Sequence, residues 1–204
     1  MSLRLFQQLP SDRQEAILNA GREEFLAVGY DLASTNRIVE RAGISKGGLF
    51  KYFGSKEGFF LYICEREAER LATESERALN ALPPDFFGAL RHMAEVELRG
   101  RTAHPERYRL VEQLLRDPNH PVHRRALAPF MQQHQAVAAM LATALRQAPL
   151  RADLPFERVM NLVLWVSEGI KAQYYTGGRT IDPDQVLAEL DQYLAILADG
   201  LRPR

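Results

Sequence analysis

Apolar residues recur every three or four positions along most of the 204-residue chain. This spacing is typical of amphipathic α-helices, which bury one face and expose the other. Alternating runs of β-branched residues, which would indicate strands, do not occur. The pattern therefore predicts an all-α protein whose helices are separated by proline and glycine.

Capping residues and helix breakers set the expected boundaries. Ser11 or Asp12 can cap the first helix, with Glu15 in place for a capping box if Asp12 is the cap, and Gly29 is expected to close that helix. Pro129 is expected to kink or shorten the longest of the later helices. The expected helices span approximately residues 11–29, 34–43, 45–54, 55–81, 85–100, 105–116, 121–147, 156–175 and 183–199.

Positive charge is concentrated near the N-terminus. The whole chain is neutral, with 26 basic and 26 acidic residues. The segment Thr35–Lys56 nevertheless carries five basic residues and one acidic residue. Such asymmetry favours a local anionic partner such as the DNA backbone, although a solvated basic helix face would show the same pattern.

The segment Ser34–Lys56 has the pattern of a helix-turn-helix. Two short amphipathic segments flank Gly43, which permits the positive φ that a tight turn requires. Ile38 in the first segment can pack on Leu49 in the second and on Phe25 upstream. In such a motif the second helix lies in the major groove of DNA.

The second of these helices is suited to DNA. Ser45 caps it and leaves backbone donors that favour phosphate. Adjacent glycines cost roughly 1 kcal/mol each in a helix, and close approach to DNA is a reason to keep them. The residues expected to face DNA are Ser45, Lys46, Gly47, Gly48, Lys51, Tyr52 and Lys56.

The stretch SKGGLFKYFGSKEGFF resembles the signature of TetR-family repressors, S-K-G-x-L-Y-x-Y-F-x-S-K-E-x-L, and ILNAGREEFLAVGYDLASTNRIVERAGIS before it resembles the family's first helix and turn. The resemblance covers about residues 11–63. It implies a three-helix DNA-binding head (1–54) joined to a larger helical effector-binding and dimerisation domain (55–204), which begins with a connecting helix (55–81). It also implies that Ser34 or Thr35 contacts phosphate.

The chain departs from the family pattern at a few positions. Gly48 and Phe50 replace residues with other side chains in the recognition helix, which leaves the base preference open. Gly21 and Glu24 stand in the first helix where Ala and Leu are common. From these two residues we expect that helix to pack more loosely than usual.

The last two helices are expected to pair with those of a second copy of the chain. Each has one broad apolar face, and a helix pair of this kind can form a four-helix bundle across a two-fold axis. Burial of both faces within one chain fits the pattern equally well, and the family resemblance decides for the dimer. The expected interface residues are Phe156, Val159, Val163, Val166, Ile170, Val186, Leu190, Tyr193, Leu194 and Leu197.

The middle helices are expected to enclose a pocket for a small, mostly hydrophobic effector. Ordinary core packing is the competing interpretation for each candidate residue. The candidates are His92, Met93, Val96, Phe130, His134, Trp165 and Tyr174.

Other chemistry finds little support in the sequence. His120 and His123 lack an obvious third ligand, and no nucleophile elbow or phosphate loop occurs, so we expect no metal, no cofactor and no enzyme activity. The single cysteine, Cys64, fits a reducing cytoplasm and is expected to be a packed apolar side chain rather than a redox sensor. The function expected is an allosteric DNA-binding transcriptional regulator, with a helical adaptor or a small helical enzyme as the alternatives.

Overall fold

A computed structural model describes residues 3–146, 151, 153–175 and 182–201. In these ranges all regular secondary structure is helical, which confirms the predicted all-α class. The helices are α1 (Leu3–Gln7), α2 (Ser11–Leu32), α3 (Thr35–Ala42), α4 (Lys46–Phe53), α5 (Lys56–Asn80), α6 (Phe86–Ala103), α7 (Pro105–Arg116), α8 (Pro121–Arg146), α9 (Phe156–Tyr175) and α10 (Pro183–Leu201).

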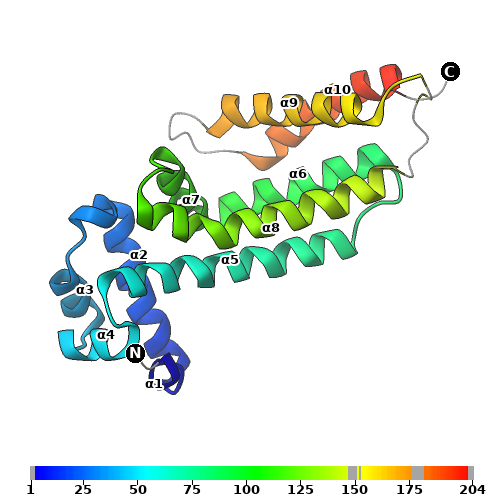
Figure 1. The fold of residues 1–204 in the computed structure, drawn as a ribbon. Coiled ribbons are helices and arrows are strands. Elements are labelled where there is room, and N and C mark those ends of the chain that lie inside the picture. Colours follow the sequence, from blue (N-terminus) through cyan, green and yellow to red (C-terminus); the bar gives the residue numbers. More distant parts are fainter. Residues whose placement is uncertain (1–2, 147–150, 152, 176–181, 202–204) are drawn as a thin grey trace. The chain divides into compact units, whose positions relative to one another are not determined.

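The chain forms two compact units (Figure 1). Unit 1 contains Met1–Ala72 and Glu106–His134, and unit 2 contains Thr73–Pro105 and Gln135–Arg204. The chain thus passes between the units within α5, at the start of α7 and within α8. The boundary predicted after residue 54 is a functional division and stays a prediction, whereas by packing α7 and the first part of α8 belong with the helix-turn-helix.

Unit 1 is built around one apolar core. Aromatic rings dominate it, and the ring centroids of Phe53 and Phe59 lie 4.6 Å apart. Ile38, Leu49 and Phe25, which the sequence predicted to pack together, are all buried in this core. Burial of each such side chain is worth about 1.5–3 kcal/mol, so the head is held together mainly by these contacts.

The short helix α1 was not predicted. Its Phe6 is fully buried, and the Phe6 ring centroid lies 4.8 Å from that of Phe53 and 5.6 Å from that of Tyr62. An isolated helix of this length is unstable in water. The aromatic contacts that Phe6 makes with α4 and α5 therefore stabilise α1.

The first turn and the end of α2 differ in detail from the prediction. Its N-cap is Pro10, which forms no side-chain cap hydrogen bond, so neither Ser11 nor Asp12 caps the helix as predicted. Gly29 leaves helical geometry as expected, at φ 78° and ψ 168°, before a last turn to Leu32. The tight packing of α5 against α2 also refutes the expected looseness: a Cβ on Gly21 would lie 2.4 Å from Phe59 Cε1.

Unit 2 contains two apolar clusters that join α6 to α9 and α10. Phe86 and Ala89 of α6 pack with α9 and with the end of α10, and Leu98 of α6 packs with α10. Ion pairs reinforce the contact between α6 and α10, including Arg91 Nε to Asp191 Oδ1 at 2.8 Å. Helix α8 continues through Pro129 rather than ending there.

Candidate DNA interface

Helix α4 has one buried side and one exposed side. Leu49 and Phe53 are fully buried in the core of unit 1, whereas Lys46, Gly47 and Lys51 are exposed. The helix therefore presents two ammonium groups and bare backbone to solvent. This is the arrangement expected of a helix that enters a DNA groove.

The cap of α4 is formed as predicted. Ser45 Oγ accepts a hydrogen bond from the backbone N–H of Gly48 at 3.0 Å. A Cβ on Gly48 would lie 3.2 Å from that hydroxyl oxygen, whereas a Cβ on Gly47 would meet nothing within 4 Å. The two glycines thus have different roles: Gly48 leaves room for the cap, and Gly47 alone exposes its backbone to an approaching duplex.

The turn between α3 and α4 is fixed by its own glycine and by α2. Gly43 has φ 62° and ψ 39°, the left-handed conformation predicted for it. Arg13 Nη2 donates a hydrogen bond of 2.6 Å to the Gly43 carbonyl oxygen. The sequence analysis did not assign a role to Arg13, because a contact across thirty residues leaves no local signal.

The N-terminus of α3 is positioned by a buried carboxylate. Ser34 caps α3, with its Oγ 3.5 Å from the Arg37 amide nitrogen, and Thr35 begins the helix. Glu24 Oε1 accepts hydrogen bonds from the Ser34 N–H (2.9 Å) and from Arg37 Nε (2.8 Å). The hydrogen bond from Arg37 lowers the pKa of Glu24 below its ordinary value, against the opposing effect of burial.

Glu24 therefore explains a departure from the family pattern that the sequence analysis read as loose packing. The side chain is buried because it fixes the start of α3. Ser34 and Thr35 are both half-buried at this end of the helix. The Thr35 amide lies where the helix dipole favours a phosphate, whereas the Ser34 amide is already bonded to Glu24.

The DNA contact predicted for Lys56 stays a prediction; in the structure Lys56 makes contacts within the head. Its ammonium donates hydrogen bonds to the carbonyl oxygens of Asp31 (3.0 Å) and Ala33 (3.2 Å). It also lies 4.7 Å from the ring centroid of Tyr30, a cation–π distance. Lys56 thus holds the connection between α2 and α3, and Tyr52, also half-buried, packs on the ring of Phe6.

Comparison with known proteins identifies the family. A sequence profile described as "Bacterial regulatory proteins, tetR family" matches residues 17–63, which carry the helix-turn-helix described above. The HTH-type transcriptional repressor AcnR of Corynebacterium efficiens is 31% identical over 191 residues, covering 87% of this chain and 90% of that protein.

The chain belongs to the TetR family. It is a DNA-binding transcriptional regulator, which favours the predicted function over the adaptor and enzyme alternatives. Solved structures share the fold. A TetR-like regulator from Rhodococcus sp. RHA1 matches with a TM-score of 0.70 at 22% identity, covering 95% of this chain and 100% of that one. A regulator from Saccharomonospora viridis in complex with choline matches with a TM-score of 0.70 at 18% identity, covering 96% and 100% of the two chains.

The residues predicted to line an effector pocket in this TetR-family regulator do not share one environment. His92, Met93 and Val96 on α6, and Tyr174 on α9, are half-buried in unit 2. His92 Nε2 lies 3.2 Å from the Ala78 carbonyl oxygen.

The other three pocket candidates lie at the surface or in the core of unit 1. Trp165 is 73% exposed and His134 is also exposed, so both are surface residues. Phe130 is buried in the core of unit 1. Helical spacing identified their apolar or aromatic character but not the element against which each packs.

Half of the predicted dimer-interface residues are buried inside the chain. These five residues pack against α6 within unit 2: Val159, Val163, Val186, Leu190 and Leu194. Four others are half-buried, namely Phe156, Val166, Ile170 and Leu197, and Tyr193 alone is exposed. An apolar stripe marks the buried side of a helix, and the sequence does not say whether a partner or the chain itself buries it.

In the described ranges, cysteine and histidine side chains outside the predicted head are either buried or lack further metal ligands. Cys64 is fully buried in unit 1, and burial raises the pKa of its thiol far above the usual range, so the thiolate is disfavoured. The rings of His120 and His123 lie 4.5 Å apart, but among the described residues no group of three His, Cys, Asp or Glu side chains could hold a metal ion. In the part of the chain that the structure describes, no helix is long and apolar enough to cross a membrane.

Proposed function

We propose that this regulator is a homodimeric repressor that places α4 of each subunit in the major groove of a palindromic operator. The exposed side of α4 carries the proposal: Lys46 and Lys51 flank the bare backbone of Gly47, and the opposite side of the helix is buried. Two such helices about 34–36 Å apart fit successive major grooves. The repressor function of the Corynebacterium efficiens relative supports repression. Such a protein would act in the cytoplasm, where bacterial DNA lies.

Exposed apolar side chains on the last two helices support the dimer. Trp165 of α9 is 73% exposed and Ile196 of α10 is 69% exposed, with Leu162 and Tyr193 also exposed on the same helices. Large apolar side chains left exposed on a helix favour an interaction site. Tyr193 and Ile196 also line a shallow groove on α10. We therefore assign the interface to this face rather than to the buried stripe.

Effector control is assigned to unit 2. Its α6 carries Met93 and Val96, both half-buried, as expected of an apolar site that admits a small molecule. The choline complex of the Saccharomonospora viridis regulator supports a small-molecule effector for this fold. An effector that binds one arrangement of the dimer better shifts the population toward it. A coupling of about 1–3 kcal/mol would change the DNA affinity about 5- to 150-fold.

Selection of bound sites from random duplex DNA with the purified full-length protein tests the proposed function. The expected result is one palindromic site whose half-site centres lie about 10 base pairs apart, and whose affinity falls steeply with salt. Lack of enrichment of any site at low salt would contradict it.

Charge substitution on the exposed apolar face tests the dimer. Trp165→Glu and Ile196→Glu should shift the protein toward monomer in sedimentation equilibrium, because each places a charge in an apolar contact. Leu32→Glu is the matched control, since Leu32 is 75% exposed but lies on α2 in the head. Equal behaviour of all three variants would show that the interface lies elsewhere.

A further inference from the structure

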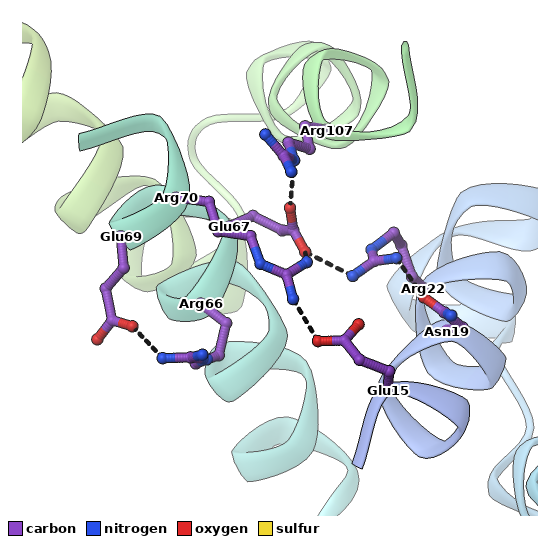
Figure 2. Close-up of polar contacts among 8 residues, drawn as sticks. All are labelled: Glu15, Asn19, Arg22, Arg66, Glu67, Glu69, Arg70 and Arg107. Carbon is purple, nitrogen blue, oxygen red and sulfur yellow. Dashed lines mark hydrogen bonds and ion pairs between the residues drawn. The ribbon is translucent and has the colours of Figure 1, made fainter. Parts of the chain in front are cut away.

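A buried carboxylate in unit 1 joins three helices (Figure 2). Glu67 of α5 is 1% exposed. Its Oε1 accepts hydrogen bonds from Arg22 Nη2 of α2 at 2.5 Å and from Arg70 Nη1 at 3.1 Å. Its Oε2 lies 3.0 Å from Arg107 Nε of α7, an ion-pair distance without the geometry of a hydrogen bond. Glu67 is therefore the common partner of arginines from the DNA-binding head, from the connecting helix and from α7.

The surrounding groups complete this ionic cluster. Glu15 of α2 pairs with Arg70, and Asn19 Oδ1 accepts a hydrogen bond of 2.5 Å from Arg22 Nη1. Figure 2 shows the pair of Arg66 and Glu69 apart from the cluster. The guanidinium groups of Arg22, Arg70 and Arg107 thus lie around the carboxylates of Glu67 and Glu15.

Stability alone is a weak reason to keep such a cluster. Burying charges costs several kcal/mol per ion, and well-packed apolar residues often replace a buried ion pair without loss. A buried hydrogen-bonded cluster does, however, allow few alternative geometries, because each misplaced charge would be left unpaired. This cluster is therefore suited to fixing the angles between α2, α5 and α7.

The cluster lies next to two of the three points where the chain passes between the units. Arg70 and Glu67 immediately precede the passage within α5, after Ala72. Arg107 immediately follows the passage at Pro105, where α7 begins. Further along α7, Gln113 Nε2 donates a hydrogen bond of 3.1 Å to the Phe25 carbonyl oxygen of α2. Helix α7 thus contacts α5 near its start, through Arg107, and α2 further along, through Gln113.

We infer that Glu67 is a positioning residue that makes α2, α5 and α7 move as one body, so that effector-driven change in unit 2 reaches the head through α7 as well as through α5. This rests on the proposed effector-controlled DNA binding. Glu67 holds α2 through Arg22 and α7 through Arg107. The orientation of each head, and hence the spacing of the two recognition helices, depends on both ion pairs.

Arg107→Met tests the pairing of α7 with Glu67, because it removes that guanidinium group and leaves Arg22 and Arg70 paired with Glu67. Arg109→Met is the matched control: Arg109 lies on the same helix and is exposed. Hydrogen–deuterium exchange of the full-length proteins without DNA gives the first readout. Amides of α7 and α2 should exchange about 2- to 30-fold faster in the Arg107 variant, and at the wild-type rate in the control.

The second readout measures head spacing. Each protein is titrated with its selected duplex and with the same duplex carrying one extra base pair between the half-sites. The wild-type preference for the correct spacing should fall about 2- to 30-fold in Arg107→Met and be partly restored in Arg107→Lys, which keeps the charge. Glu67→Gln should show a larger loss, because it leaves three guanidinium groups with one carboxylate.

Two results would overturn the inference. One is wild-type exchange of α7 and α2 in Arg107→Met. The other is faster exchange with an unchanged spacing preference, which would show that the cluster only stabilises the fold. If wild-type protein bound no duplex, the proposed function would fail, and exchange would still decide whether Glu67 joins α2 to α7.

Discussion

Replacement of Gly21 by alanine tests how closely α2 and α5 approach each other. The added Cβ would lie 2.4 Å and 2.6 Å from Phe59 Cε1 and Cζ and 2.7 Å from Ile63 Cδ1. Phe59 cannot move aside readily, because it is fully buried and its ring centroid lies 4.6 Å from that of Phe53. Overpacking of a filled core costs about 1–3 kcal/mol, occasionally more.

The gain in helix propensity opposes this cost. Alanine is favoured over glycine in a helix by about 1 kcal/mol. With three contacts inside van der Waals distance we expect a cost near the upper end, and hence a net destabilisation of about 1–2 kcal/mol. For a chain of this size that corresponds to a melting temperature lower by about 2–8 °C.

Gly47→Ala is the matched comparison. A Cβ at Gly47 meets nothing within 4 Å, so the variant should melt at or above the wild-type temperature, yet it should bind DNA more weakly because a methyl group stands between backbone and duplex. Thermal unfolding followed by circular dichroism and DNA titration measure both effects. An unchanged or raised melting temperature for Gly21→Ala would refute the packing described for α2 and α5.

Four further variants or conditions separate DNA contacts from fold contacts. Lys51→Ala should weaken DNA binding and reduce the slope of log affinity against log salt by about 1, at an unchanged melting temperature. The control Arg109→Ala should change neither the DNA affinity nor the slope. An unchanged slope for Lys51→Ala would count against a phosphate contact. Lys56→Met should lower the unfolding free energy by about 1–2 kcal/mol because two carbonyl oxygens lose a charged donor, and wild-type stability would show that this clamp is dispensable. The pKa of Glu24 is lowered in the folded state, so its contribution to stability is present above its unfolded pKa near 4.5 and is lost as pH falls through the folded pKa. Glu24→Gln should therefore weaken the fall in unfolding free energy between about pH 5 and 3. The same fall in the variant and the wild type would exclude Glu24 as a source of the acid sensitivity. Burial raises the pKa of the Cys64 thiol, so a thiol reagent at about pH 8 should label native protein no faster than it unfolds, and rapid labelling would contradict its burial.

Local signals predicted the helix-turn-helix well. The caps at Ser34 and Ser45 and the left-handed Gly43 depend only on residues within a few positions of one another. The buried set around Leu49 follows from helical periodicity, which is strong in short amphipathic helices. These features can therefore be predicted from the sequence without knowledge of the tertiary structure.

Features that depend on distant segments were missed or misassigned. The DNA contact expected for Lys56 stays a prediction, but its contacts with carbonyl groups more than twenty residues earlier left no local signal in the sequence. Gly21 and Glu24 suggested loose packing, because their partners are distant in the sequence. The ring of Phe59 fills the space at Gly21, and the guanidinium of Arg37 pairs with Glu24.

The last two helices show the same limit. Val163 and Leu190 lie on apolar stripes, and the stripe predicts burial without naming the partner. Of the exposed side chains on these helices, Tyr193 is among the interface residues expected from the sequence, whereas Trp165 and Ile196 are not. Only the packing of α6 on α9 and α10 distinguishes the two faces.

Methylation protection of guanine N7 on the selected duplex tests most directly whether α4 reads the major groove, because N7 lies in that groove. The full-length protein should protect guanines in two segments about 10 base pairs apart on one face of the duplex, and the protection should weaken in Lys51→Ala. Protection of a single segment, or full occupancy without any N7 protection, would contradict the placement of two α4 helices in successive major grooves.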